Sequence, residues 1–74
     1  MTETVMNLRG LKCPLPALRV RKKLSSLNSG DLIVAECTDP LAAIDIPNLL
    51  RQTGDTLVDK AEGEGVLTFR IRKK

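Results

Sequence analysis

The sequence contains no histidine, no tryptophan and no tyrosine, and it has one phenylalanine in 74 residues. Without histidine the chain cannot form a Ser/His or Cys/His catalytic pair, and it cannot offer histidine ligands to zinc. Two cysteines alone make a poor structural zinc site. We therefore expect no metal and no cofactor. The near-absence of aromatic rings also argues against modules that stack nucleic-acid bases.

The chain also lacks a long apolar run. Nothing approaches the roughly 20 apolar residues of a membrane-spanning helix. The first eight residues carry an acidic residue and do not resemble a signal peptide. We expect a cytoplasmic protein that does not contact a membrane. Because thiols stay reduced in that compartment, Cys13 and Cys37 are expected to be free thiols.

Charge is also modest, with twelve basic and nine acidic residues and a net charge of +3. The stretch 70–74 holds four of the basic residues, so the rest of the chain is nearly neutral. This balance makes direct nucleic-acid binding unfavourable. With 42% hydrophobic and 28% charged residues, the composition is typical of a globular protein with an aliphatic core. We expect one domain over residues 1–74, and a monomer.

Turn residues divide the chain into six predicted elements. Apolar periodicity predicts helices over 13–28 and 39–53, and strands over 4–8, 32–37, 57–61 and 66–72. In the second helix, Asp39 is the expected N-cap, Pro40 the first helical residue, and Gly54 the stop. An interior proline removes a backbone hydrogen bond, so Pro47 predicts a kink or a restart near 45–47.

The order β-α-β-α-β-β predicts the fold class. A β-α-β unit pairs its strands in parallel through a right-handed crossover, whereas the closing hairpin is antiparallel. The expected fold is a two-layer α/β (α+β) sandwich, with a four-stranded mixed sheet and both helices on one face. Thr68, Arg70 and Arg72 alternate with apolar residues along the last strand, so they should face water on the other side of the sheet.

Cys13 lies where the first strand ends and the first helix begins. With Cys13 as the N-cap, Pro14 and Pro16 fall in the first turn, where a missing N–H costs no helical hydrogen bond. The amides of Leu15 and Ala17 would then face the sulfur, so the positive end of the helix is expected to lower the pKa of the thiol.

Four cations lie near this predicted helix start or along the helix itself: Arg9, Lys12, Arg19 and Lys22. Arg9 and Lys12 would add positive charge near the thiol. All four, with Lys23, are candidates for docking acidic partner surfaces. A solvated helix face explains the helical cations equally well.

The residues around Cys13 supply a nucleophile without a general base. This fits chemistry in which sulfur itself reacts, and it does not fit acyl-transfer hydrolysis. The alternative for Cys13 is a small hydrophobe at a helix cap. Cys37, at the end of an apolar strand, reads as core packing, and Asp45 reads as a second N-cap beside Pro47.

The segment 10–16, Gly-Leu-Lys-Cys-Pro-Leu-Pro, resembles the CPxP signature of the TusA-like (SirA/YeeD) small sulfur-carrier proteins. The similarity continues at Thr38-Asp39-Pro40 and Asp45-Ile46-Pro47 and covers essentially the whole chain. Asn7 stands where many members have Asp, and Cys37 is not part of the signature.

The resemblance implies a cytoplasmic sulfur relay in which Cys13 carries a persulfide and Pro14 and Pro16 form a rigid helix start. It implies a sulfurtransferase-type carrier component with two protein partners, a sulfur donor of the cysteine desulfurase or rhodanese type and a sulfur acceptor. Members serve tRNA thiolation, cofactor biosynthesis or sulfur oxidation, and no residue here selects among these routes. The competing hypothesis is a small regulatory protein-interaction domain without sulfur chemistry.

Overall fold

The computed structural model describes residues 3–74 and has the six elements in the predicted order. They are β1 (Glu3–Leu8), α1 (Leu15–Ser25), β2 (Leu32–Cys37), α2 (Ala42–Thr53), β3 (Thr56–Gly63) and β4 (Val66–Arg72). Within the described residues, no helix is long and apolar enough to cross a membrane.

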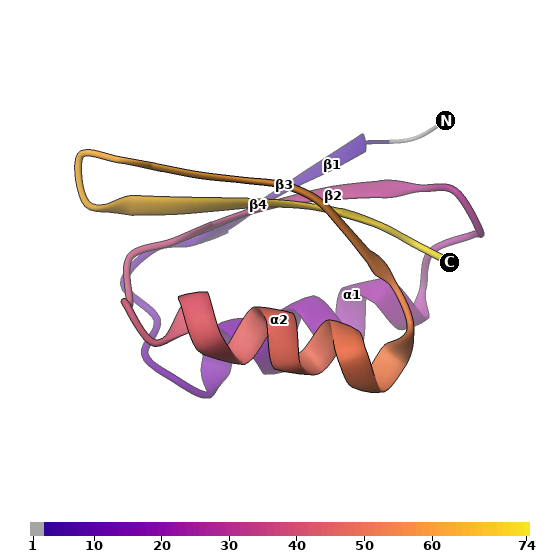
Figure 1. The fold of residues 1–74 in the computed structure, drawn as a ribbon, viewed down its shortest axis with the longest axis horizontal. Coiled ribbons are helices and arrows are strands. Elements are labelled where there is room, and N and C mark those ends of the chain that lie inside the picture. Colours follow the sequence, from indigo (N-terminus) through magenta and orange to yellow (C-terminus); the bar gives the residue numbers. More distant parts are fainter. Residues whose placement is uncertain (1–2) are drawn as a thin grey trace.

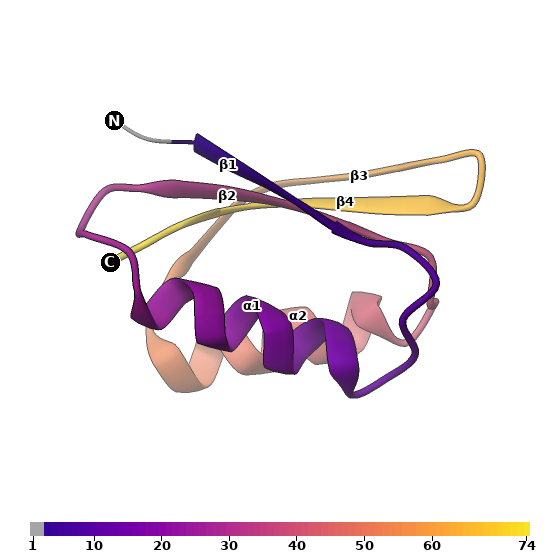
Figure 2. The same cartoon turned by 180° about the vertical axis from the view of Figure 1, so that it is seen from behind.

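The four strands form one mixed sheet in the order β1-β2-β4-β3. β1 and β2 pair in parallel, and β4 pairs antiparallel with both β2 and β3. Figures 1 and 2 show both helices packed under one face of this sheet, which leaves the other face open. The predicted two-layer sandwich is therefore confirmed.

Element boundaries follow the prediction closely for β2 and β4, which have the predicted limits. β3 is longer than predicted and contains an irregularity between Leu57 and Asp59. At the hairpin turn, both Glu64 and Gly65 have positive φ, of 54° and 77°. Positive φ at both central residues is the geometry of a two-residue turn whose twist matches that of the paired strands.

The core lies between the sheet and the helices. Alternate residues of β2 and β4 point inward, and Ile33, Phe69 and Ile71 are fully buried there. From α1, residues at helical spacing complete the core: Pro16, Val20 and Leu24. From α2, the buried set is Ala42, Ile46, Leu49 and Leu50. These spacings of three and four place one stripe of each helix against the sheet.

Two predictions about α2 need correction. The helix is one continuous element through Pro47, so the predicted restart is wrong. It begins at Ala42 with Leu41 as N-cap, rather than with Asp39 as N-cap and Pro40 as the first helical residue. Leu41 and Ile44, which contributed to the predicted apolar pattern, lie off the buried stripe and are 52% and 59% exposed.

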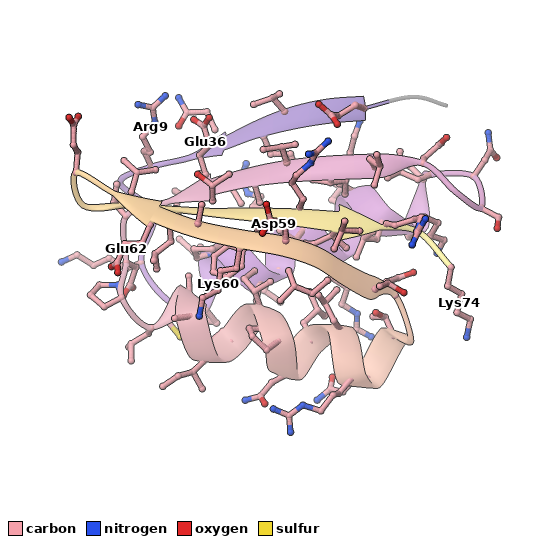
Figure 3. All side chains as sticks on the ribbon, turned by 45° about the horizontal axis from the view of Figure 1, so that its top comes forward. Arg9, Glu36, Asp59, Lys60, Glu62 and Lys74 are labelled. Carbon is pink, nitrogen blue, oxygen red and sulfur yellow. The ribbon has the colours of Figure 1, made fainter. Side chains whose placement is uncertain are left out.

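The open face of the sheet carries charged residues, as the alternation in β4 predicted. Arg70 pairs with Glu3 at 2.7 Å, joining β4 to β1 across β2. Arg9 pairs with Glu36 at 3.0 Å, and Figure 3 shows both side chains on this open face.

The direction of the chain determines that the loops before α1 and α2 lie at the same end of the sheet. α1 and α2 run in the same direction, and both begin at the end of the sheet where the strands β1 and β2 finish (Figures 1 and 2). β1 begins and β4 finishes at the opposite end of the sheet (Figure 1). Parallel crossovers impose this arrangement, because each helix must return the chain to the start of the next strand. The first turns of the two helices are thereby brought together.

Candidate functional site

Cys13 lies between the end of β1 and the start of α1, and its side chain is only partly buried. The backbone N–H of Cys13 donates a hydrogen bond to Oδ2 of Asp39 at 2.6 Å. The other oxygen of Asp39 accepts the backbone N–H of Leu41 at 2.9 Å. Asp39 therefore ties the loop that carries Cys13 to the chain that enters α2. These two amide donors, and the nearby Lys12, lower the pKa of its carboxyl.

The thiol of Cys13 makes a hydrogen bond to Oδ2 of Asp45, in the first turn of α2. Sequence reasoning assigned Asp45 to a helix cap and missed this contact, because the two residues are 32 positions apart. Element order alone contained a signal for it. In a β-α-β-α chain with parallel pairing, the first turns of both helices meet at one edge of the sheet.

The pKa of Cys13 is raised, not lowered as the sequence suggested. The main cause is the hydrogen bond to Asp45, followed by partial burial and by the negative charges of Asp45 and Asp39. A carboxylate beside a thiol opposes the formation of a second negative charge. The prediction of an acidic thiol at a positive helix end is therefore wrong.

The start of α1 differs from the predicted one and uses the amide of Leu15 elsewhere. The N-cap is Pro14 rather than Cys13, and the helix begins at Leu15. The N–H of Leu15 donates to the carbonyl oxygen of Lys12 at 2.8 Å, so it is committed to the turn that precedes the helix. Pro16 is fully buried under the first turn and contributes to the core. The cysteine thus precedes the cap by one residue.

The predicted cations lie in different places. Arg9 is engaged on the open face with Glu36 and with the side-chain oxygen of Asn7. Lys12 lies close enough to lower the pKa of Asp39. Arg19 and Lys22 line a groove of about 280 Å³ together with Met6, Lys23 and Ser26. The structure therefore groups Arg19 with Lys22 beside β1, and it does not bring Arg9 to them.

Exposed leucine and isoleucine side chains lie close in sequence to Cys13 and to Asp45, and sequence reasoning did not identify them as exposed. They belong to the beginnings of both helices and are here called the apolar rim: Leu15, Leu18, Leu41 and Ile44. A groove of about 210 Å³ between α1 and α2 leads to Asp45 and includes Pro14 and Leu18 in its lining. Exposed apolar side chains grouped around a reactive atom are typical of protein-binding surfaces.

Cys37, the other free thiol, differs from Cys13 in its burial. It ends β2 on the inner face of the sheet and is 0% exposed. Its pKa is raised mainly by burial and secondarily by Asp39. The interpretation of Cys37 as core packing agrees with this position.

The arrangement presents one accessible sulfur atom beside a carboxylate. Within residues 3–74, no three Cys, His, Asp or Glu side chains lie close enough together to hold a metal ion. The prediction that the nucleophile has no base beside it is wrong, since Asp45 accepts the thiol proton's hydrogen bond. What the site offers is a partly exposed thiol, a carboxylate that accepts its hydrogen bond, and an apolar rim.

Comparison with known proteins places this geometry in context. The family model described as Sulfurtransferase TusA matches residues 4–73. The sulfur carrier protein TusA of Allochromatium vinosum is 37% identical over 68 residues, which cover 92% of this chain and 90% of that protein. The sulfur carrier protein TusA of Pseudomonas aeruginosa is 33% identical over 72 residues, which cover 97% and 91%. A Neisseria meningitidis protein, named as a candidate sulfur carrier, is 39% identical over the full length of both chains.

Proposed function

Because this chain belongs to the TusA sulfurtransferase family, we propose that it is a sulfur carrier in which Cys13 holds a sulfur atom as a persulfide and passes it to an acceptor protein. The observation that carries this proposal is the position of the thiol. Cys13 is the accessible cysteine of the two, and it lies just before α1 with its thiol bonded to the first turn of α2.

The proposed loading step is an exchange of sulfane sulfur. The sulfur of Cys13 attacks the outer sulfur of a donor protein's persulfide, a new S–S bond forms at Cys13, and the donor's S–S bond breaks. The donor leaves as a thiol and takes up a proton equivalent to the one that Cys13 loses. No oxidant or reductant is consumed, and delivery repeats the exchange with an acceptor thiol.

Partner proteins must reach the sulfur directly, because a persulfide is transferred by contact. The apolar rim gives the donor and the acceptor a surface to bury around Cys13. The cations of α1, Arg19 and Lys22, line a separate groove beside β1, and their charge would favour acidic partners. The relay would operate in the reducing cytoplasm, where Cys13 remains available as a thiol between transfers.

Pro14 and Pro16 support the carrier role by fixing the backbone next to the reactive residue. Pro14 is the N-cap of α1 and Pro16 is buried in its first turn, and a proline side chain has no polar group to offer. Their contribution is orientation of the sulfur rather than chemistry.

A regulatory interaction domain is the alternative, and mass spectrometry separates the two. After incubation with a cysteine desulfurase and cysteine, the carrier hypothesis predicts a mass gain of about 32 Da, one sulfur atom, on Cys13. The Cys13→Ser variant should lose this gain, whereas Cys37→Ser should retain most of it. Labelling of Cys13→Ser at the wild-type level would contradict the mechanism.

A further inference from the structure

The hydrogen bond between Cys13 and Asp45 depends on whether the carrier is loaded. In the unloaded protein the donor is the S–H group of Cys13, and the acceptor is a carboxylate oxygen. A persulfide has no hydrogen on its inner sulfur, since that atom is bonded to Cβ and to the outer sulfur. Loading therefore abolishes the donor, and the same contact cannot form at the inner sulfur.

The outer sulfur of a persulfide does not replace the lost donor. A persulfide is more acidic than the corresponding thiol, so it carries more negative charge at neutral pH. Asp45 accepts the hydrogen bond of the thiol, and Asp39 accepts the backbone N–H of the same residue, so both carboxylates lie close to this position. Lys12 is the cation close to Asp39. Two carboxylates facing the sulfur repel an anionic persulfide.

We propose that Asp45 is a positioning residue that distinguishes the two states of the carrier: it retains the unloaded thiol and releases the loaded persulfide toward the surface. This inference rests on the proposed sulfur-carrier function. It adds a role for a residue that touches the thiol directly but forms no bond with the transferred sulfur.

The energetic consequence favours delivery over loading. Sulfur exchange with a donor interconverts Cys13 thiol plus donor persulfide with Cys13 persulfide plus donor thiol. Asp45 stabilises only the state with the free Cys13 thiol, because only that state has an S–H group to donate. The hydrogen bond is strong because its acceptor is charged. The loaded carrier is therefore the less favoured partner in the exchange, and it gives up its sulfur readily.

The unloaded carrier is also protected from side reactions. A thiol that keeps its proton is a weak nucleophile, because the thiolate is the reactive species. If an unloaded Cys13 attacked the inner sulfur of another carrier's persulfide, the two chains would be joined by a disulfide and hydrosulfide would be released. Retention of the proton by Asp45 slows this attack, as it also slows the attack of Cys13 on a donor persulfide.

The test compares Asp45→Asn and Asp45→Ser with Asp59→Asn, all in a Cys37→Ser background. Asp59 is on β3, with its side chain on the open face of the sheet (Figure 3), so this control removes one negative charge elsewhere. The first measurement is the rate of Cys13 alkylation by iodoacetamide against pH. Both Asp45 variants should show a lower apparent pKa and react several-fold faster at neutral pH, with Asp59→Asn unchanged.

The second measurement is the fraction of Cys13 persulfide at equilibrium with glutathione persulfide and glutathione, determined by mass spectrometry. The ratio of loaded to unloaded carrier should rise about fivefold in both Asp45 variants. Asp45→Glu, which restores a carboxylate, should return both readouts toward wild type. Circular dichroism verifies that each variant keeps its fold.

The outcomes separate this inference from the function on which it rests. Unchanged pH profiles and unchanged loading ratios in both Asp45 variants would overturn the role of Asp45 while leaving the carrier function intact. If wild-type Cys13 never accepted sulfur from either glutathione persulfide or a cysteine desulfurase, the carrier function itself would fail, and the role of Asp45 with it.

Discussion

The two cysteines lie at the same edge of the molecule and have opposite environments. Cys13 follows β1 and is partly exposed, whereas Cys37 ends β2 on the inner face and is sealed in the core. The pKa of both thiols is raised, through the hydrogen bond to Asp45 for Cys13 and through burial for Cys37. Asp39 contributes to both shifts.

The comparison shows that access, not acidity, distinguishes the proposed carrier residue. Neither environment favours the thiolate, so the usual sign of a reactive cysteine, a lowered pKa, is missing. Cys13 differs in being partly exposed, and its thiol is held by one hydrogen bond, to Asp45. A stabilised thiolate would favour the unloaded carrier and would not help it to hold a persulfide.

The largest expected difference is in alkylation of the folded protein. At neutral pH, iodoacetamide should modify Cys13 at least about 100-fold faster than Cys37, because the buried thiol reacts only after local opening. Peptide mass mapping after timed quenching measures both rates in one sample. In urea the two rates should become similar. Faster reaction of Cys37 in the folded state would show that the assignment of the accessible nucleophile is wrong.

The next difference is in stability. Cys37→Ser places a hydroxyl group in an apolar environment, which should lower the free energy of unfolding by about 1–3 kcal/mol. Cys13→Ser, at a partly exposed position that still allows a hydrogen bond to Asp45, should change it by less than about 0.5 kcal/mol. Urea denaturation followed by circular dichroism measures both values. Equal losses would mean that Cys13 is as much a packing residue as Cys37.

The smallest expected effect concerns how partners approach Cys13. Arg19→Glu with Lys22→Glu should slow sulfur loading by a cysteine desulfurase several-fold at low salt, because the acidic partner surface is no longer attracted. At high salt the rates of variant and wild type should converge, since exposed charges are screened beyond about 8–10 Å. The kinetics are followed by mass spectrometry of the Cys13 persulfide.

Arg72→Glu with Lys73→Glu is the matched control, because it reverses two charges at the edge opposite the helix starts. It should leave the loading rate near that of wild type. If both double variants had identical rates and salt slopes, the α1 cations would be a solvated surface and not a docking surface.

The fold was predictable because its signals are local. Alternation in β4, the nearly continuous apolar run of β2 and the glycine after α2 each specify one element without reference to the others. The helix starts were less predictable. Asp39 has the side chain of an N-cap, but its carboxylate is used by the backbone of Cys13 as well as by Leu41, and α2 begins at Ala42.

The candidate site was predictable only in part. Cys13 and its prolines stand next to one another in the sequence, so their proximity required no fold. The thiol's pKa was predicted with the wrong sign because the deciding group, Asp45, comes from another helix. The apolar rim was missed for a related reason. Leu41 and Ile44 fit an apolar helix by composition, and only the spacing of the buried residues shows that they fall outside its core-facing stripe.

The directions of the strands also determine how this protein tolerates attachment to others. β1 begins and β4 ends at the edge of the sheet away from Cys13, and the N–H of Lys74 is anchored to Asp55 at 2.9 Å. A tag, a tether or a whole neighbouring domain joined at either terminus would therefore extend from the rear of the molecule. Such an attachment should leave the thiol of Cys13 unobstructed.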